Sequence, residues 1–200
     1  TFTEAQTLAE ASEISGSVSA SDTDDGAVLS YALVGAAIEG LTFSADGSWD
    51  FDATHGEYDY LAVGESADVT VNYSVTDENG GTDTASFTIT VTGTNDAPVA
   101  TFVAAQTATE AGEVVSGQLT SSDVDASDEA TYALVGDAIE GLTINADGRW
   151  TFDPTVGAYA HLAAGAEQEI TVEYLVEDGN GGSDTASFTI TVTGTNDAPV

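Results

Sequence analysis

The sequence TGTNDAPV occurs twice in the chain, as Thr92–Val99 and as Thr193–Val200, 101 residues apart. Sliding the chain by 101 positions aligns Gly16–Val99 with Gly117–Val200, and 52 of these 84 positions are identical. A period of about 100 residues is too long for a solenoid unit and is the size of an independent sandwich domain. The chain is therefore predicted to be two tandem copies of one domain.

The repeat has one irregularity near its start. Before Gly16 the offset falls to 100, so that Glu10 aligns with Glu110. We place the gain or loss of one residue between Ile14 and Gly16. The domains are predicted at residues 1–96 and 97–200, and the second ends in the connector to a following repeat.

The pattern within each copy is that of β-strands. FTITVTG, VTVNYSV and ITVEYLV alternate apolar and polar residues with period two, as half-buried strands do. Asp46-Gly47 and Asp147-Gly148 are predicted to supply the positive-φ residues of two hairpin turns. About seven strands per copy, labelled A to G in chain order, suit a Greek-key sandwich, so the fold class is all-β: two tandem Greek-key β-sandwiches placed end to end. The Asn-Asp-Ala-Pro element is predicted to be a short, stiff joint, because proline fixes φ. We call the segment that begins with this element, residues 95–100 between the two copies, the connector.

Charge restricts the function. The chain has 35 acidic residues and one basic residue, Arg149, which gives a formal net charge of −34. Nucleic acids and anionic membranes bind through Lys and Arg, so both are excluded as partners. The chain has no cysteine, and no apolar run approaches the length of a membrane span, so direct membrane insertion is not expected. Cations from solution must screen this charge.

The strand order predicts where the acids gather. The B–C and F–G loops should lie at the end of a sandwich where the chain enters, and the A–B and E–F loops where it leaves. One junction should then collect oxygen ligands from copy one, the connector and copy two: Glu10, Asn95, Asp96, Asp123, Asp125 and Asp178. Two carboxylates about 4 Å apart repel by roughly 4 kcal/mol at an effective dielectric constant near 20, so a cation is expected between them.

The ligand types favour Ca²⁺. Calcium takes six to eight oxygen ligands in loose geometry, whereas zinc requires His or Cys. Partial sets are expected at the two ends, with Asp22, Asp24 and Asp77 at the start and Glu110, Asn196 and Asp197 at the finish.

The run Gly-Thr-Asn-Asp-Ala-Pro-Val, the Asp-x-Asn-Gly-Gly loop and the Asp-Gly-x-Trp hairpin resemble the VCBS repeats of giant bacterial adhesins secreted by the type I pathway. The layout is also similar to that of cadherin repeats, which bind calcium between domains. This resemblance implies Ig-like or cadherin-like β-sandwiches, and it implies the same junction ligands: Glu10, Asn95, Asp96, Asp123, Asp125 and Asp178. The sequence lacks the second Asn of the cadherin connector, and the only candidate for an E–F loop ligand is Glu65, which aligns with Ala166.

Plain structural interpretations exist for the same residues. Asp-x-Asp can be a pair of Asx turns, Asn95-Asp96 can be a turn before proline, and Asp178 can cap the Gly-Gly turn. Glu13 can substitute for Glu10. Trp49 and Trp150 are predicted to be core residues, and Asp83 and Asp184 to be solvated strand starts.

No catalytic motif is present. His55 aligns with Val156 and His161 with Tyr60, and neither lies in a nucleophile or zinc motif. The sequence therefore predicts no enzyme.

The predicted function is a calcium-rigidified extender of a giant bacterial surface adhesin, which projects a distal ligand-binding domain from the cell. The expected location is extracellular, on the bacterial surface, and the expected partners are adjacent repeats of the same polypeptide, with the chain itself monomeric. Two alternatives remain: a sandwich that itself binds a glycan or protein, and an accessory repeat of a secreted hydrolase. A glycan binder should expose aromatic residues that differ between the copies.

Overall fold

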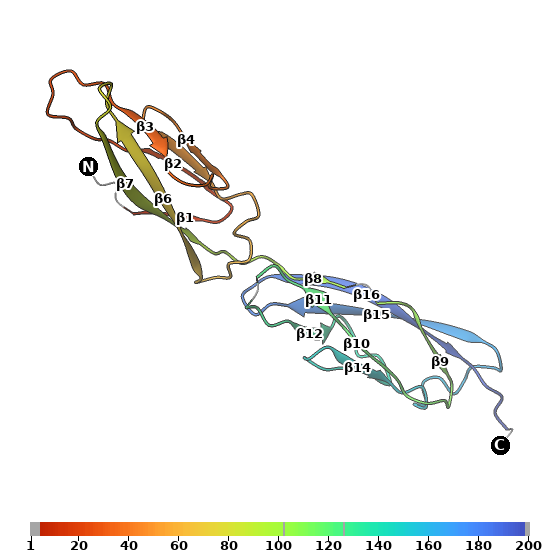
Figure 1. The fold of residues 1–200 in the computed structure, drawn as a ribbon. Coiled ribbons are helices and arrows are strands. Elements are labelled where there is room, and N and C mark those ends of the chain that lie inside the picture. The colour runs from red at the N-terminus through yellow and green to blue at the C-terminus, as the bar shows by residue number, and fades with distance from the viewer. Residues whose placement is uncertain (1–4, 102, 126, 199–200) are drawn as a thin grey trace. The chain divides into compact units, whose positions relative to one another are not determined.

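The computed structural model describes residues 5–101, 103–125 and 127–198, which contain strands and no helix. The chain divides into two compact units: unit 1 comprises Thr1–Asn95 and Val124–Ala126, and unit 2 comprises Asp96–Asp123 and Ser127–Val200. Each unit is a sandwich of β-sheets (Figure 1). The predicted fold class, two tandem β-sandwich domains, is confirmed.

Unit 1 has seven strands in two sheets. The first sheet has the order β1-β7-β6-β3, with β1 parallel to β7, and the second has the order β2-β5-β4. The strands are β1 Gln6–Ala9, β2 Glu13–Ser17, β3 Ser30–Leu33, β4 Leu41–Phe43, β5 Ser48–Asp52, β6 Ser66–Thr76 and β7 Thr82–Thr92.

Unit 2 repeats this topology and adds two short strands. Its sheets have the orders β12-β15-β16-β9 and β10-β14-β13, and a further pair joins β8 to β11. The strands are β8 Val99–Ala100, β9 Gln106–Thr109, β10 Val115–Gln118, β11 Ser121–Ser122, β12 Thr131–Leu134, β13 Leu142–Ile144, β14 Arg149–Phe152, β15 Glu167–Glu177 and β16 Ser183–Thr193.

Strand alternation builds each core as the sequence predicts. In β7 the side chains of Phe87, Ile89 and Val91 are buried, and the threonines between them face outward. Trp49 is 1 % exposed and packs on Phe87 with ring centroids 4.9 Å apart. A Cβ on Gly16 would lie 2.5 Å from the Trp49 ring, so this position excludes any side chain.

Unit 2 repeats this packing with Trp150, which is 1 % exposed and stacks on Phe188 at 5.0 Å. Both tryptophans are therefore core residues, as predicted.

The two Asp-Gly hairpins form, but the aspartates do not adopt the positive φ that was predicted for them. Only the glycines have positive φ, 87° at Gly47 and 80° at Gly148. The aspartates act through their side chains. Asp46 Oδ1 accepts hydrogen bonds from the backbone N–H of Ser48 at 2.9 Å and from its hydroxyl at 2.6 Å. Such Asx turns favour aspartate without a left-handed backbone.

The one-residue difference between the copies lies earlier than the sequence alignment placed it. Ile14 pairs with Phe51 and Val115 with Phe152, so the offset is already 101 at these positions. The extra residue is therefore in the turn after Glu110. Ala111 has a φ of 53° there, and Gly112 donates a 2.8 Å hydrogen bond to the Thr109 carbonyl. Internal similarity misplaced the insertion, because Glu-Ala-x-Glu recurs at an offset of 100, as Glu10–Glu13 and Glu110–Glu113.

The loops gather at the two ends of each unit as the strand order predicts. We call the end where the chain enters a unit its proximal end, and the end where it leaves its distal end. At the proximal end of unit 1, the Val28 amide donates to Glu78 across the B–C and F–G loops at 2.7 Å. At its distal end, the amides of Glu10 and Gly93 bond to the carbonyls of Thr92 and Glu65.

Candidate metal centre

Glu10 is a buried carboxylate at the distal end of unit 1. It is 2 % exposed, and its Oε1 accepts hydrogen bonds from the backbone N–H of Thr94 at 2.6 Å and from the Thr94 hydroxyl at 2.7 Å. Its Oε2 is buried and has no hydrogen-bond partner. A buried carboxylate oxygen without a partner is costly, so this geometry fits a group that receives a cation.

The TGTNDAPV sequence explains how this glutamate is held. A Cβ on Gly93 would lie 2.1 Å from the Leu61 carbonyl oxygen, so glycine lets the E–F loop cross the end of β7. Thr94 follows directly and holds the Glu10 carboxylate. The next two residues, Asn95 and Asp96, are partly exposed and stand where the connector begins.

Unit 2 repeats the arrangement. Glu110 is 5 % exposed, and its Oε2 accepts a 3.0 Å hydrogen bond from the Thr195 amide. Gly194 again lies under the E–F loop, and a Cβ on it would lie 2.4 Å from the Ala163 carbonyl oxygen. Asn196 and Asp197 follow and are exposed.

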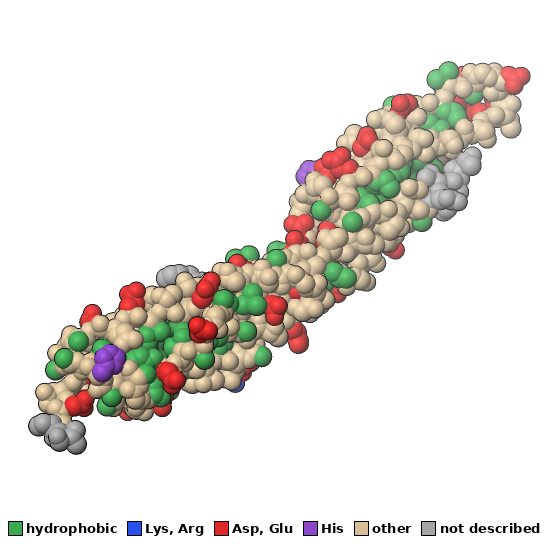
Figure 2. Space-filling model, turned by 180° about the vertical axis from the view of Figure 1, so that it is seen from behind, with side chains coloured by type: hydrophobic (Ala, Val, Ile, Leu, Met, Phe, Trp, Pro, Cys, Tyr) green, Lys and Arg blue, Asp and Glu red, His purple; other side chains and the backbone are tan. Residues whose placement is uncertain are grey.

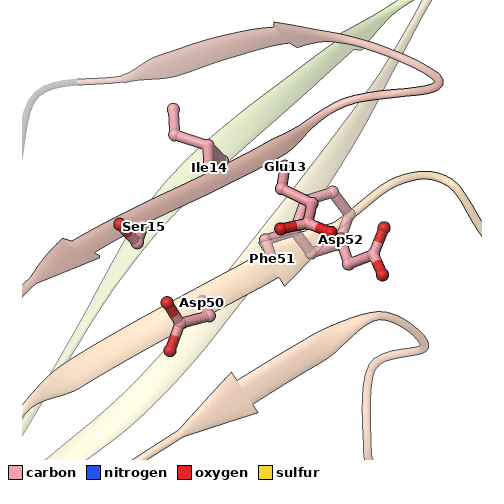
Figure 3. Close-up of a pocket in the computed structure, with 6 residues that line it drawn as sticks. All are labelled: Glu13, Ile14, Ser15, Asp50, Phe51 and Asp52. Carbon is pink, nitrogen blue, oxygen red and sulfur yellow. The ribbon is translucent and has the colours of Figure 1, made fainter.

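Glu13, the alternative to Glu10, is exposed. It lies on β2 directly opposite Asp52 of β5, and the two line a surface pocket with Ser15 and Asp50 (Figure 3). Glu65, the candidate from the E–F loop, closes a local turn, in which its Oε2 accepts the Ala62 amide at 3.3 Å.

Asp178 organises the proximal end of unit 2. It is 4 % exposed, and its Oδ1 accepts three backbone N–H groups, from Asn180 at 2.6 Å, Gly181 at 2.9 Å and Gly182 at 3.1 Å. Oδ1 of Asp178 therefore caps the Gly-Gly turn, as the structural interpretation of this residue predicted. A carboxylate has two oxygens, so capping through one is compatible with a metal role for the other.

Three carboxylates meet beside this loop. Ligand atoms of Asp123, Asp128 and Asp178 lie within 4.8 Å of one another. Asn180 Nδ2 donates to both oxygens of Asp128 at 2.9 Å. At this spacing each carboxylate pair repels by roughly 3 to 4 kcal/mol at an effective dielectric constant near 20. These three residues could hold a metal ion, and carboxylate oxygens are the ligands that calcium prefers.

Asp128 was missed by the sequence. It aligns with Ala27 in copy one, so the comparison of the copies gave no reason to select it. The only feature of the sequence that could have indicated Asp128 as a ligand is its position three residues after Asp125 in an acidic loop. Asp125, which was predicted, is 2 % exposed.

The proximal end of unit 1 carries the same motifs in a looser form. Asp22 and Asp24 are exposed, and the Asp24 amide donates to Asp22 Oδ1 at 2.9 Å in an Asx turn. Asp77 is partly exposed and accepts the amides of Asn79 and Gly81, both at 2.8 Å.

Part of the connector is a strand of unit 2. Pro98 is buried, and β8 follows it and pairs with β11. The Ala100 amide donates to Asp184 Oδ2 at 2.9 Å, and Tyr174 donates its hydroxyl hydrogen to the Thr101 carbonyl at 2.9 Å. The sequence predicted that Asp184 is a solvated strand start, but its side chain binds the connector. It anchors the connector, whereas its counterpart Asp83 is exposed.

The acids with a lowered pKa are Asp46, Asp52 and Asp153, and none of them is a predicted metal ligand. Hydrogen bonds from the hydroxyl and amide of Ser48 lower the pKa of Asp46, and those of Thr54 and Thr155 lower the pKa of Asp52 and Asp153. These groups shape exposed turns. Acidic side chains are spread over the surface visible in Figure 2. Within the described residues, the Arg149 guanidinium forms one ion pair, with Asp147 at 3.2 Å.

The two histidines make local contacts. His55 Nδ1 lies 3.3 Å from Asp52 Oδ2, and His161 Nδ1 lies 2.9 Å from the Ala158 carbonyl oxygen.

The fold and these ends define a class: tandem cadherin-like or Ig-like β-sandwich repeats. Residues 95–194 match the bacterial cadherin-like domain, and residues 1–90 match a bacterial Ig domain. The chain belongs to the family of bacterial cadherin-like domains, and the cadherin part of the resemblance is confirmed. Both matched families consist of non-catalytic structural or binding modules.

Solved structures share the fold. Human protocadherin-24 EC1-2 has a TM-score of 0.64 at 18 % identity, covering 96 % of this chain and 95 % of that one. Mouse cadherin-23 EC22-24 has a TM-score of 0.61 at 16 % identity, covering 96 % and 62 %. The protocadherin gammaB4 extracellular domain has a TM-score of 0.58 at 17 % identity, covering 95 % and 33 %, so this chain spans one third of its length.

No curated protein matches the sequence at a significant level. The described residues form no helix of a length and hydropathy suited to crossing a membrane.

Proposed function

We propose that the chain is a calcium-rigidified extender segment of a giant bacterial surface adhesin, secreted by the type I pathway and built from VCBS-type repeats. It acts outside the cell, projects a distal ligand-binding domain and performs no catalysis. Repeat boundaries at residues 1–96 and 97–200 place a joint at each Asn-Asp-Ala-Pro element. The direct partners are neighbouring repeats of the same polypeptide, and the segment is monomeric.

The geometry of Glu10 is the observation that carries this proposal. Its buried Oε2 has no hydrogen-bond partner, while Oε1 is fixed by Thr94 at the start of the connector. The chain holds one cationic side chain against 35 acidic ones, so no internal partner can neutralise such groups. A calcium ion satisfies the oxygen and also ties the A–B turn to the connector.

Chain connectivity supports a shared joint. Thr94 is bonded to unit 1, and Val99 begins a strand of unit 2, so only four residues, Asn95–Pro98, lie between these fixed points. Two of the four have oxygen-bearing side chains. We expect ions held by Asn95 and Asp96 to be shared with Glu10 on one side and with Asp123, Asp125 and Asp178 on the other.

The binding-module alternative has less support. The tryptophans that would form a sugar platform are 1 % exposed in both copies. Among the described residues, the exposed large apolar side chains are single valines and Tyr60, and isolated residues of this kind are normal on a protein surface.

The joint is tested by replacing both Asp123 and Asp125 by Ala. Small-angle scattering in saturating calcium should show a broader range of end-to-end distances than the parent, because the joint loses two ligands while the apolar cores remain. The matched control replaces Asp22 and Asp24 by Ala, the same positions in copy one, and should leave the distribution unchanged. An unchanged distribution in the Asp123/Asp125 variant would refute the extender mechanism.

A further inference from the structure

The dipeptide Asn-Gly occurs twice in the chain, as Asn79-Gly80 and as Asn180-Gly181, at the same position of the F–G loop in the two copies. An asparagine before glycine can lose its side-chain amide without an enzyme, because glycine has no Cβ to keep its backbone nitrogen away from the preceding side chain. Both asparagines are exposed, and a Cβ added at either glycine would meet nothing within 4 Å. A difference in reactivity between the two sites must therefore come from their hydrogen bonds.

In unit 2 both reacting groups are held by carboxylates. Asn180 Nδ2 donates to both oxygens of Asp128 at 2.9 Å. The backbone nitrogen of Gly181, which is the nucleophile in the reaction, donates to Asp178 Oδ1 at 2.9 Å. Hydrogen bonds to an ionised acceptor are stronger than those between neutral groups. Deamidation at Asn180 has to break them, because the side chain must turn toward the backbone and the nitrogen must lose its proton.

In unit 1 neither group is held in this way. The side-chain amide of Asn79 makes no hydrogen bond to any described residue. The Gly80 nitrogen donates to the backbone carbonyl oxygen of Asp77 at 3.4 Å, which is long for a hydrogen bond and joins neutral groups. The Asp77 carboxylate accepts the amides of Asn79 and Gly81 instead.

The cause of this difference lies in the loops themselves. Asp128 aligns with Ala27, whose methyl group cannot accept a hydrogen bond. The B–C and F–G loops of unit 1 are joined by Glu78, which accepts the Val28 amide at 2.7 Å, and this bond does not engage the Asn79 side chain. The contrast between the two sites therefore depends on residues inside each unit and not on a neighbouring repeat.

We propose that Asn79 is a site of spontaneous deamidation and that Asn180 is protected from the same reaction. The Gly80 nitrogen gives its proton to solvent and attacks Cγ of Asn79. The Cγ–Nδ2 bond then breaks, and the leaving nitrogen takes up a proton and departs as ammonia. Water opens the remaining succinimide ring at either of its carbonyl carbons, which gives aspartate or isoaspartate. The net reaction consumes a water molecule and releases ammonia, with no oxidant or reductant.

The products change the loop in two ways. Both add a carboxylate beside Asp77 and Glu78. Isoaspartate also adds a methylene group to the backbone between the amides of residue 79 and Gly81, which Asp77 Oδ1 now accepts together at 2.8 Å. These amides then lie further apart along the chain, so we expect the turn to open.

The test follows both sites in the full folded chain, kept in salt and chelator at mildly alkaline pH, by peptide mapping with mass spectrometry. Pepsin suits the map, because the chain has one basic residue for trypsin to use and acid slows further reaction during digestion. We expect Asn79 to react at least about tenfold faster than Asn180, since breaking a hydrogen bond to a charged group slows a reaction by about this factor. In denaturant the two rates should become similar.

Reciprocal variants test the cause. Asp128→Ala should speed the reaction of Asn180, and Ala27→Asp, which supplies the missing acceptor, should slow that of Asn79, each by about threefold or more. Ala27→Asp keeps the test decisive if Asp128→Ala does not fold. Equal rates at the two sites in the folded chain, an unchanged ratio in denaturant, or no effect of Ala27→Asp would overturn the proposal.

A last comparison separates the added charge from the added methylene group. The variant Asn79→Asp carries the charge on a normal backbone. The Gly81 amide should exchange its hydrogen faster in the isoaspartate fraction of aged protein than in the parent, and at the parent rate in Asn79→Asp. Equal exchange in the isoaspartate fraction and the parent would show that the turn does not open.

Discussion

The proximal ends of the two units carry the same Ser-Asp-x-Asp and Asp-x-Asn-Gly-Gly motifs and differ in how complete they are. In unit 2 the strand β8 is docked, and Asp178 and Val176 are buried. In unit 1 their counterparts Asp77 and Val75 remain partly exposed. The distal ends, by contrast, are nearly alike, since each is made from its own A–B turn, E–F loop and last strand. In unit 2 the strand β8 completes the proximal end, whereas each distal end is built from its own unit.

The likeness of the distal ends is tested by Gly93→Ala and Gly194→Ala. Each added Cβ would meet an E–F loop carbonyl oxygen, at 2.1 Å and 2.4 Å. We expect each variant to lower the free energy of unfolding of its own unit by about 3 kcal/mol in denaturant titrations. Gly157→Ala is the control, because a Cβ there meets nothing within 4 Å. A large loss in one variant and none in the other would mean that the distal ends are not equivalent.

The difference between the proximal ends is tested by Asp178→Ala and Asp77→Ala in the presence of chelator. Asp178 accepts three backbone N–H groups while buried, whereas Asp77 accepts two while partly exposed. Unsatisfied buried donors are costly, so we expect a loss of about 3 kcal/mol for Asp178→Ala and about half of that for Asp77→Ala. Equal losses would contradict the distinction.

A narrower test compares the strand anchors Asp184 and Asp83. Replacing Asp184 by Ala removes the acceptor of the Ala100 amide and should cost about 1.5 kcal/mol, with faster hydrogen exchange at Ala100. Asp83→Ala should change stability by less than about 0.5 kcal/mol, as an exposed side chain usually does. If the Ala100 amide exchanges as slowly in Asp184→Ala as in the parent protein, Asp184 does not anchor the connector strand.

The smallest effect is expected at the A–B turns. Ala111 has a left-handed backbone, so Ala111→Gly should stabilise unit 2 by about 0.5 to 1 kcal/mol. Ala11 has no positive φ, and Ala11→Gly should destabilise unit 1 by a similar amount through the entropy of the unfolded chain. Thermal unfolding of both variants gives the sign of each stability change. A change of the same sign in both variants would contradict the left-handed backbone assigned to Ala111 alone.

Hydrophobic alternation and the long internal repeat were the reliable guides in the sequence. Period-two alternation located the long strands, and the repeat established two domains. Loop order alone placed Glu10 and Asp178 at ends of sandwiches, and the structure shows both buried there.

Other features depend on tertiary contacts that have no local signature. Asp128 approaches Asp123 and Asp178 only because the B–C and F–G loops fold together. The sequence predicted that Asp184 is a solvated strand start, because nothing in it indicates the hydrogen bond from the Ala100 amide. The position of the inserted residue required the register of β10 against β14.

Calcium binding by the native protein is the central claim, and thermal unfolding in calcium and in chelator at equal ionic strength tests it most directly. A site filled at 100 times its dissociation constant adds about 2.7 kcal/mol to the stability of the native state. For a domain of about 100 residues this raises the unfolding midpoint by about 10 °C or more. We predict a shift of this size with millimolar calcium, and a smaller one in Glu10→Gln. A shift of no more than about 2 °C in the parent protein would contradict the account.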